Sequence, residues 1–229
     1  MIRRILSAAL AAGLLAGVLV SVLQAVTTTP LILQAEVFET GGGPHSHAGH
    51  DHTGHDHAAP LPAEPEAEDI VTRAALTATA NLITGVGFAL LVVGAFALSG
   101  RRVEAGEGLL WGLGGFAAFT LSPALGLPPE LPGTIAADLA SRQAWWAFAA
   151  LGAAGGLAVL AFGKGWWRLP VGLTLLVLPH AIGAPHPDAF GGSVPPELAG
   201  AFVAKSIVVS AIFWTVLGWL AGGFFKRFV

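Results

Sequence analysis

The sequence predicts an all-α integral membrane protein with about six transmembrane helices. Hydrophobic residues make up 54% of the 229-residue chain and charged residues only 11%, whereas an ordinary soluble domain is about 25% charged. Long apolar segments recur along the chain, and charged residues gather between them. With 11 basic residues against 14 acidic ones, the chain lacks the basic surface of a nucleic-acid-binding protein. It has no cysteine, which excludes disulfides and thiolate metal sites.

Each predicted span approaches the roughly 20 apolar residues that cross a bilayer. The first follows Arg3 and Arg4, and its apolar run is longer than the core of a signal peptide, so we expect it to be retained, with cleavage as the alternative. The fifth is short and contains Pro170 and Pro179. The predicted spans are 5–27, 74–98, 108–127, 143–162, 168–183 and 199–225.

We divide the chain into three regions. The first transmembrane helix belongs to 1–33, an external loop rich in histidine and acidic residues covers 34–72, and a five-helix membrane bundle covers 73–229. The spans pair as three outward hairpins, each with a proline near the outer end of its first helix. Two alternative explanations of this similarity stay open. One is an internal duplication, with repeats related by an axis along the membrane normal, and the other is the general preference of loops for proline and glycine.

The basic residues orient the helices. Lys and Arg concentrate in short cytoplasmic loops of membrane proteins, and placing both termini in the cytoplasm puts most acidic residues outside. The loops then predicted to be cytoplasmic hold eight of the 11 basic residues, namely Arg3, Arg4, Arg101, Arg102, Lys164, Arg168, Lys226 and Arg227. The remaining three, Arg73, Arg142 and Lys205, lie at outer helix starts, where they are expected to anchor the interface. Trp145 and Trp146 are expected in the same interfacial belt.

Six of the eight histidines cluster in the predicted external loop. They are His45, His47, His50, His52, His55 and His57. Neutral imidazole binds Zn²⁺, Cu²⁺, Ni²⁺ and Co²⁺. The flanking Gly-rich and Pro/Glu-rich sequence cannot form a core, so we expect a flexible loop that collects metal ions. The alternative is a low-complexity insertion whose metal affinity is incidental.

Polar residues inside the predicted spans gather in the outer halves, which predicts a vestibule open to the outside. His180 closes the fifth span and His186 follows it, and we predict that both contact metal. An alternative for His180 is a hydrogen bond to a carbonyl freed by Pro179, and for Asn81 a bond between helices. The chain contains no zinc-protease, serine-hydrolase or phosphate-binding motif, so we expect no enzyme activity.

Several longer motifs carry a resemblance to a known family. They include GLLWGLGGF at 108–116, PALGLPPELPG at 123–133, RQAWW at 142–146 and LPHAIGAP at 178–185. Through them nearly the whole chain resembles the cobalt transporter subunit family CbtA. The resemblance implies cobalt uptake for cobalamin synthesis, a place in the bacterial inner membrane, and a small single-span partner with its own histidine motif, CbtB. Members of the family are usually described with five spans, one fewer than we count.

Together these features predict a membrane subunit of an uptake transporter for cobalt or another divalent transition metal. The external histidine loop captures the ion, and His180 and His186 pass it into the bundle. We expect no tightly bound cofactor, with Co²⁺ as the ion carried or bound and Ni²⁺ or Zn²⁺ as alternatives. The alternative function is a membrane-anchored metal buffer or sensor that moves no ion, because the inner halves of the spans lack an evident series of metal ligands.

Overall fold

The computed structural model describes residues 2–41, 67–189 and 191–228. Within these residues the chain is helical, apart from connecting loops and one isolated bridge between Thr134 and Gly192. The predicted metal-collecting loop, with its six histidines between 45 and 57, lies outside the described residues. Its flexibility and its metal binding therefore stay predictions.

Four helices of the described chain are long and apolar enough to cross a membrane. They are α1 (Ile2–Thr27), α3 (Ala67–Ser99), α6 (Leu139–Phe162) and α8 (Pro196–Phe228). Each coincides with a predicted span. All four begin before the predicted starts at 5, 74, 143 and 199, and α3 does so by the most residues, so the helices extend beyond their apolar cores.

A second helix, α2 (Thr29–Gly41), follows α1 after a single turn residue, Thr28. Pro30 explains the break, because proline has no backbone N–H to donate and its ring crowds the preceding turn of a helix. The external loop predicted to begin at residue 34 therefore begins as helix, and regular turns continue to Gly41.

The third predicted span is one helical run in three pieces. These are α4 (Ala105–Phe116), the π-helical turn η1 (Ala117–Leu121) and α5 (Ser122–Ala124). Pro123 lacks the N–H that would continue the α-helical pattern, and the N–H of Ser122 donates to the carbonyl oxygen of Ala117, five residues back. At about 1.5 Å per residue the run spans about 30 Å, the thickness of a bilayer core.

The fifth predicted span is the shortest. Helix α7 (Arg168–Ile182) has 15 residues, or about 22 Å at 1.5 Å per residue, against a bilayer core of about 30 Å. It carries Pro179 near its end. The prediction of six spans thus rests on four helices of sufficient length, one helical run interrupted by a π-turn, and one short helix.

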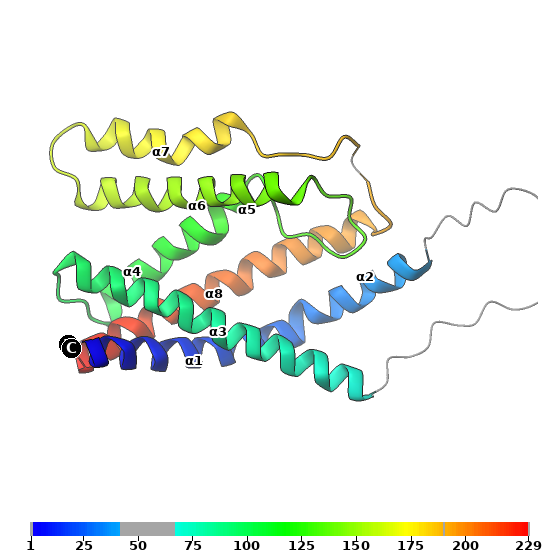
Figure 1. Cartoon of the computed structure of the whole chain (residues 1–229), viewed down its shortest axis with the longest axis horizontal. Helices are drawn as coiled ribbons and strands as arrows, with labels where there is room; N and C mark the ends of the chain where they lie inside the picture. Colours follow the sequence, from blue (N-terminus) through cyan, green and yellow to red (C-terminus); the bar gives the residue numbers. More distant parts are fainter. Residues whose placement is uncertain (1, 42–66, 190, 229) are drawn as a thin grey trace, which may run out of the picture.

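The helix ends gather on two sides of the molecule (Figure 1). Both chain termini lie on one side with the turns at 100–104 and 163–167, and we call this the termini side. The end of α2, the start of α3 and the loop segments 125–138, 183–189 and 191–195 lie on the other, the long-loop side. All eight basic residues predicted to be cytoplasmic flank helix ends on the termini side. The membrane face that each side meets stays a prediction.

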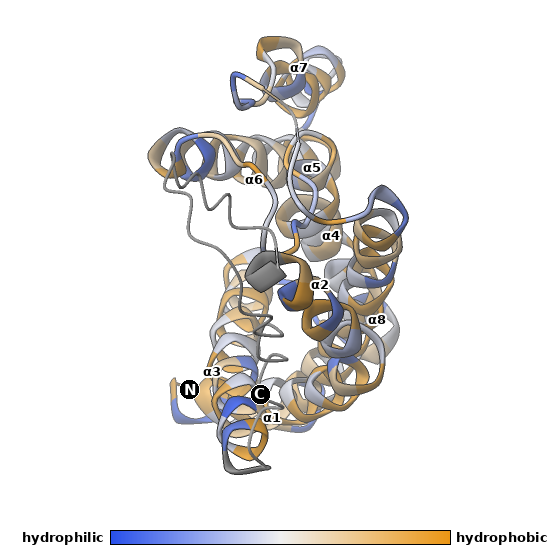
Figure 2. Cartoon of the chain, turned by 90° about the vertical axis from the view of Figure 1, so that its right-hand side faces the viewer, coloured by the Kyte–Doolittle hydropathy of each residue, from blue (hydrophilic) through white to orange (hydrophobic). Residues whose placement is uncertain are grey.

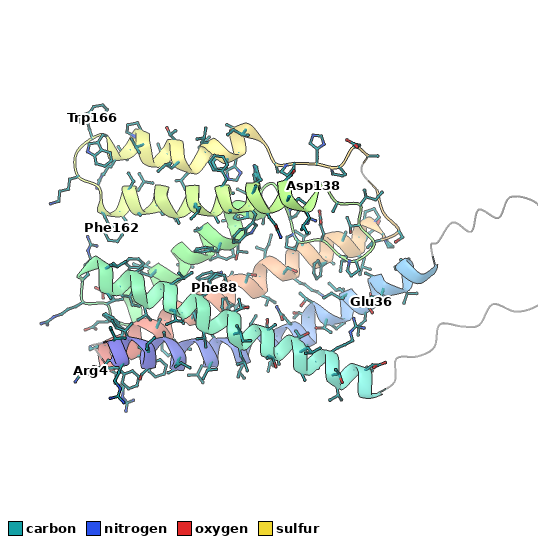
Figure 3. The ribbon with its side chains drawn as sticks, viewed as in Figure 1. Arg4, Glu36, Phe88, Asp138, Phe162 and Trp166 are labelled. Atoms are coloured by element: carbon teal, nitrogen blue, oxygen red, sulfur yellow. The ribbon has the colours of Figure 1, made fainter. Side chains whose placement is uncertain are left out.

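Helices α1, α3, α4 and α8 pack together as the main bundle. Glycines let their backbones approach closely, as is common between transmembrane helices. A Cβ atom added to Gly13 of α1 would lie 2.5 Å from the Cα of Val86 in α3, and one added to Gly218 of α8 would fall on the carbonyl oxygen of Gly108 in α4. Aromatic rings fill the wider middle of the bundle, where Phe88 (Figure 3) lies 4.6 Å from the Trp214 ring.

Helices α6 and α7 form a second unit, which we call the arm. They pack through Gly156, whose added Cβ would lie 2.8 Å from the carbonyl oxygen of Gly172. Within the described chain the backbone of α7 packs only against α6, and its His180 side chain reaches Ser122 of α5. Helix α6 meets the rest mainly at η1 and α5. Figure 2 shows α7 beyond α6, away from α1 and α3. The third hairpin predicted from the sequence is therefore not a packed pair, because α7 lies on α6 while α8 lies on α4 and α1.

Candidate functional site

His180 lies in the last turn of α7, on the long-loop side, where the arm meets α5. Its side chain is half-buried, and its Nε2 atom lies 3.1 Å from the hydroxyl oxygen of Ser122. Ser122 is only 8% exposed, and its hydroxyl also lies 3.4 Å from the carbonyl oxygen of Ala149 in α6. One hydroxyl group thus joins three helices at this point.

The π-turn accounts for the position of Ser122. It ends directly before Ser122, and Pro123 follows. A π-turn inserts one extra residue into a helix, which rotates the side chains after it relative to those before, and such turns are frequent at functional sites. Thr120 within the turn accepts a hydrogen bond from the Trp214 indole of α8, at 3.2 Å. The turn is therefore fixed on one side by the main bundle and presents Ser122 to the arm.

Trp145 of α6 holds the neighbouring backbone. Its indole N–H donates to the carbonyl oxygen of Pro179 at 3.2 Å, and its ring meets the His180 ring edge-on, with centroids 5.8 Å apart. The side chain is 7% exposed. Trp145 therefore packs inside the protein, whereas Trp146, at 40% exposure, lies at the surface. The place of both residues in an interfacial belt stays a prediction. Trp145 is buried because its N–H finds an internal acceptor.

The alternative role predicted for His180, a bond to a carbonyl freed by Pro179, differs from the observed contact. Pro179 has no N–H to donate, so the carbonyl of Leu175 is freed from the helix. That carbonyl faces Gly152 of α6, where a Cβ atom added to the glycine would lie 2.8 Å from its oxygen. The described contacts of His180 are instead with Ser122 and Trp145.

His186 lies in the loop after α7 and is exposed. Its Nδ1 atom lies 3.2 Å from the carbonyl oxygen of Pro187. It lines an open depression with Trp145, Ser141 and the 183–185 segment. His180 and His186 therefore share Trp145 as a neighbour. In the part of the chain that the structure describes, no three His, Asp or Glu side chains converge on one point, so the metal contacts of both histidines stay predictions.

A second polar contact lies in the main bundle. The side-chain amide of Asn81 in α3 donates to Gln24 Oε1 at 2.7 Å and to Ser21 Oγ at 3.2 Å, both in α1. The interhelical bond predicted as the alternative for Asn81 is confirmed. The Asn81 amide nitrogen thus links α3 to two side chains of α1.

Two of the three basic residues predicted to lie at outer helix starts form ion pairs. Arg73 binds Glu36 of α2, with Nη1 and Oε2 3.1 Å apart, and Arg142 Nη2 lies 2.5 Å from Glu130 Oε2. The hydrogen bond from Arg73 lowers the pKa of Glu36, so this carboxyl stays charged at neutral pH. Lys205, the third, is exposed in α8. These ion pairs favour a structural role for Arg73 and Arg142. A direct contact with a metal ion is disfavoured, because a fixed cation repels a metal ion.

The sequence prediction missed Ser122. A hydroxyl directly before a proline inside an apolar span was the available signal, because that proline breaks the regular hydrogen bonding of the helix. Its partner His180 is 58 residues away in the sequence, and no local pattern indicates such a contact.

Comparison with known proteins gives one family. Residues 2–226 match the family described as "Probable cobalt transporter subunit (CbtA)". No curated protein and no solved structure matches the chain. The matched region covers every helix of the main bundle and of the arm except the last two residues of α8.

Proposed function

The chain belongs to the CbtA family of probable cobalt transporter subunits, and from this premise we propose that it is the membrane subunit that admits Co²⁺ in an uptake transporter. The family is one of transporter subunits rather than of enzymes, and its description as a subunit implies a partner and a membrane context. The apolar helices that are long enough to cross a bilayer fit that context.

We propose that the ion is first held by the histidine-rich segment between α2 and α3. Imidazole is a good ligand for Co²⁺. The end of α2 and the start of α3 both lie on the long-loop side, the side on which His180 and His186 also lie (Figure 1). An ion held on this side of the molecule would meet the arm on the same side. The acidic residues in the loops of this side raise the local cation concentration.

The environment of His180 is the observation that best supports the transfer of the ion from the histidine-rich segment into the bundle. It is half-buried at the junction of α5, α6 and α7, and one of its ring nitrogens contacts Ser122. Exposed His186 precedes it as an outer contact, and both adjoin Trp145. A metal ligand at such a junction can respond to movement of the arm relative to the main bundle.

The proposal includes a partner and an orientation. A small single-span protein with its own histidine motif completes the pathway, since one chain offers few ligands within its helices. The termini side faces the bacterial cytoplasm, which the basic residues at its helix ends favour. Because the chain has no nucleotide-binding motif, any ATP hydrolysis belongs to another subunit.

Accumulation of radiolabelled Co²⁺ tests the proposal, in cells that lack other cobalt importers and express the chain with its small partner. We expect uptake above the empty-vector level, and loss of that uptake in His180→Ala. Ile182→Ala is the matched control, because Ile182 lies in the same final turn and is 65% exposed. Uptake at the wild-type rate in His180→Ala, with insertion verified, would remove this histidine from the pathway.

Deletion of residues 44–58 tests the capture step separately. The expected result is a higher Co²⁺ concentration at half-maximal uptake, with the maximal rate mostly retained, because the segment concentrates the ion without forming the pathway. The measurement is the dose response of uptake. An unchanged dose response would show that the segment takes no part in capture.

A membrane-anchored metal buffer or sensor is the second candidate. The candidate histidines with described positions, His180 and His186, lie near one side, and no cluster of three ligands occurs within the described helices. Purified protein and partner in sealed liposomes with an internal cobalt-sensitive dye discriminate the two functions. A dye response indicates translocation, whereas external binding without a response indicates the buffer or sensor.

A further inference from the structure

The contact between His180 and Ser122 bears on how the histidine meets an ion, and the inference drawn from it rests on the proposed function. A neutral imidazole carries a proton on one ring nitrogen and a lone pair on the other, and only the nitrogen with the lone pair can bind a metal. The partners of the two nitrogens therefore decide which one is available.

The neighbours of Ser122 assign the proton. Its hydroxyl can donate to the carbonyl oxygen of Ala149, 3.4 Å away, and that oxygen can only accept. The hydroxyl oxygen can then accept a hydrogen bond from His180 Nε2, 3.1 Å away. Both contacts are then hydrogen bonds: the Nε2–H of His180 donates to the Ser122 hydroxyl oxygen, and the Ser122 hydroxyl donates to the Ala149 carbonyl oxygen. With its proton on Nε2, the ring has its lone pair on Nδ1.

The surroundings hold this arrangement in place. Ser122 is buried and its backbone is fixed by the π-turn, while Trp145 binds the carbonyl oxygen of Pro179 and contacts the His180 ring edge-on. Both the acceptor and the ring are therefore set before any ion arrives. Metal-binding histidines commonly donate their other ring N–H to a fixed acceptor, which orients the ring and selects the nitrogen that binds.

We propose that Ser122 is a positioning residue that holds the Nε2–H of His180 and so presents Nδ1 as the ligand for Co²⁺. Ser122 does not touch the ion. Its loss leaves the imidazole present but free to rotate and to change the nitrogen that carries the proton. Loss of such a supporting partner typically lowers metal affinity about 10- to 100-fold.

Uptake measurements with three variants test the role in transport. Ser122→Ala is expected to raise the Co²⁺ concentration at half-maximal uptake about tenfold or more, with the maximal rate largely kept. Ser122→Thr retains the hydroxyl and is expected to restore most of the affinity. Thr215→Ala is the matched control, because it removes a half-buried helix hydroxyl that bonds only within α8, to the Ala211 carbonyl at 2.7 Å. A wild-type dose response in Ser122→Ala overturns the proposal.

A second measurement needs neither cobalt nor transport. In the purified full chain labelled with ¹⁵N-histidine, the His180 signal is the one that His180→Ala removes. Near pH 8.5, where an ordinary imidazole is neutral, we expect a proton on Nε2 that exchanges slowly with water, and faster exchange in Ser122→Ala. A proton on Nδ1 in the wild type overturns the proposal even if Ser122→Ala impairs uptake.

The two measurements separate the failure of this inference from failure of the proposed function. If the wild type takes up no cobalt, the transport proposal fails, and the role of Ser122 in cobalt uptake fails with it, whatever the NMR result. If the wild type transports cobalt while Ser122→Ala changes neither the dose response nor the exchange of the ring proton, only the positioning role fails.

Discussion

The main bundle and the arm use the same kind of helix contact but hold different polar groups. In both, a glycine on one helix lies against the backbone of the next, as with Gly218 in α8 and Gly156 in α6. The bundle holds Asn81, whose side-chain amide nitrogen donates to both Ser21 and Gln24 of α1. The junction of the arm holds His180, which we infer keeps one nitrogen for a ligand. Close glycine contacts thus occur in both regions, and the proposed metal ligand lies where the arm meets the bundle.

The two regions also differ in how they are supported. Each helix of the main bundle packs against at least two others, whereas α7 packs only against α6 among the described helices and reaches α5 through the His180 side chain. Damage to a bundle contact should therefore spread through the molecule, while damage within the arm should stay local. Four predictions test this difference, and the largest expected effect comes first.

The largest effect is expected for Gly218→Ala in α8. The added methyl group would fall on the carbonyl oxygen of Gly108, so α4 and α8 must separate. Overpacking of this kind costs about 1–3 kcal/mol, and we expect a lower thermal unfolding midpoint of the whole protein in detergent. Gly223→Ala is the control on the same helix, because its methyl group would lie 3.9 Å from Ala105, an ordinary contact. Equal midpoints for the two variants would contradict close α4–α8 packing.

The second effect is expected for Gly156→Ala in α6. Its methyl group would lie 2.8 Å from the Gly172 carbonyl oxygen and push α7 away, which displaces His180. We expect greater protease sensitivity of the 163–167 turn and reduced cobalt uptake, with the unfolding midpoint of the main bundle nearly unchanged. Gly155→Ala is the control, since its nearest contact would be Leu175 at 3.8 Å. A midpoint as low as that of Gly218→Ala would show that the arm is not a separate unit.

The third effect is expected for Asn81→Ala in the main bundle. The change removes both hydrogen bonds to α1, and interhelical bonds of this kind average about 0.6 kcal/mol in membrane proteins. We expect a small fall in stability and an unchanged Co²⁺ dose response. Ser122→Ala should show the reverse, with a changed dose response and little change in stability. A large uptake defect in Asn81→Ala would place a second functional group in the bundle.

The smallest effect is expected at the start of the arm, where Asp138 caps α6. The backbone N–H of Ser141 donates to its carboxylate at 2.9 Å and, with the Ser141 hydroxyl, lowers the pKa of Asp138. Because the pKa of Asp138 is lower in the folded state, its ionised carboxylate stabilises the folded state when the pH is above the ordinary aspartate pKa of about 3.9. This contribution is lost as the pH falls through the folded-state pKa. We expect the first turn of α6 to exchange its amide hydrogens faster below about pH 4.

Two variants check the cap. Asp138→Asn keeps an acceptor oxygen without titrating, so it should remove the pH dependence, while Asp138→Ala should expose the first turn at every pH. Hydrogen exchange of the Ser141 amide, corrected for its intrinsic rate, is the measurement. The same pH profile for the wild type and Asp138→Asn would remove Asp138 from this role.

The sequence by itself determined the features that depend on composition along the chain. Apolar segments of sufficient length predicted the four long helices, because a bilayer core demands about 20 apolar residues whatever the neighbours are. The family followed from motifs such as PALGLPPELPG at 123–133 and is confirmed over residues 2–226. His180 was identified as a candidate because a polar imidazole at the end of an apolar transmembrane segment costs free energy, and such residues are commonly functional.

Only the tertiary structure decided which helices pair and which polar groups meet. Pairs of glycines four residues apart occur in α1, α4, α6 and α8, and small-residue spacing alone permits any of these helices to pack on any other. The complete packing places α8 on α4 and α7 on α6, against the third predicted hairpin. It also brings Ser122 to His180 and buries Trp145 beside Pro179. These contacts join residues far apart in the chain, so they depend on which helix faces meet rather than on any local pattern.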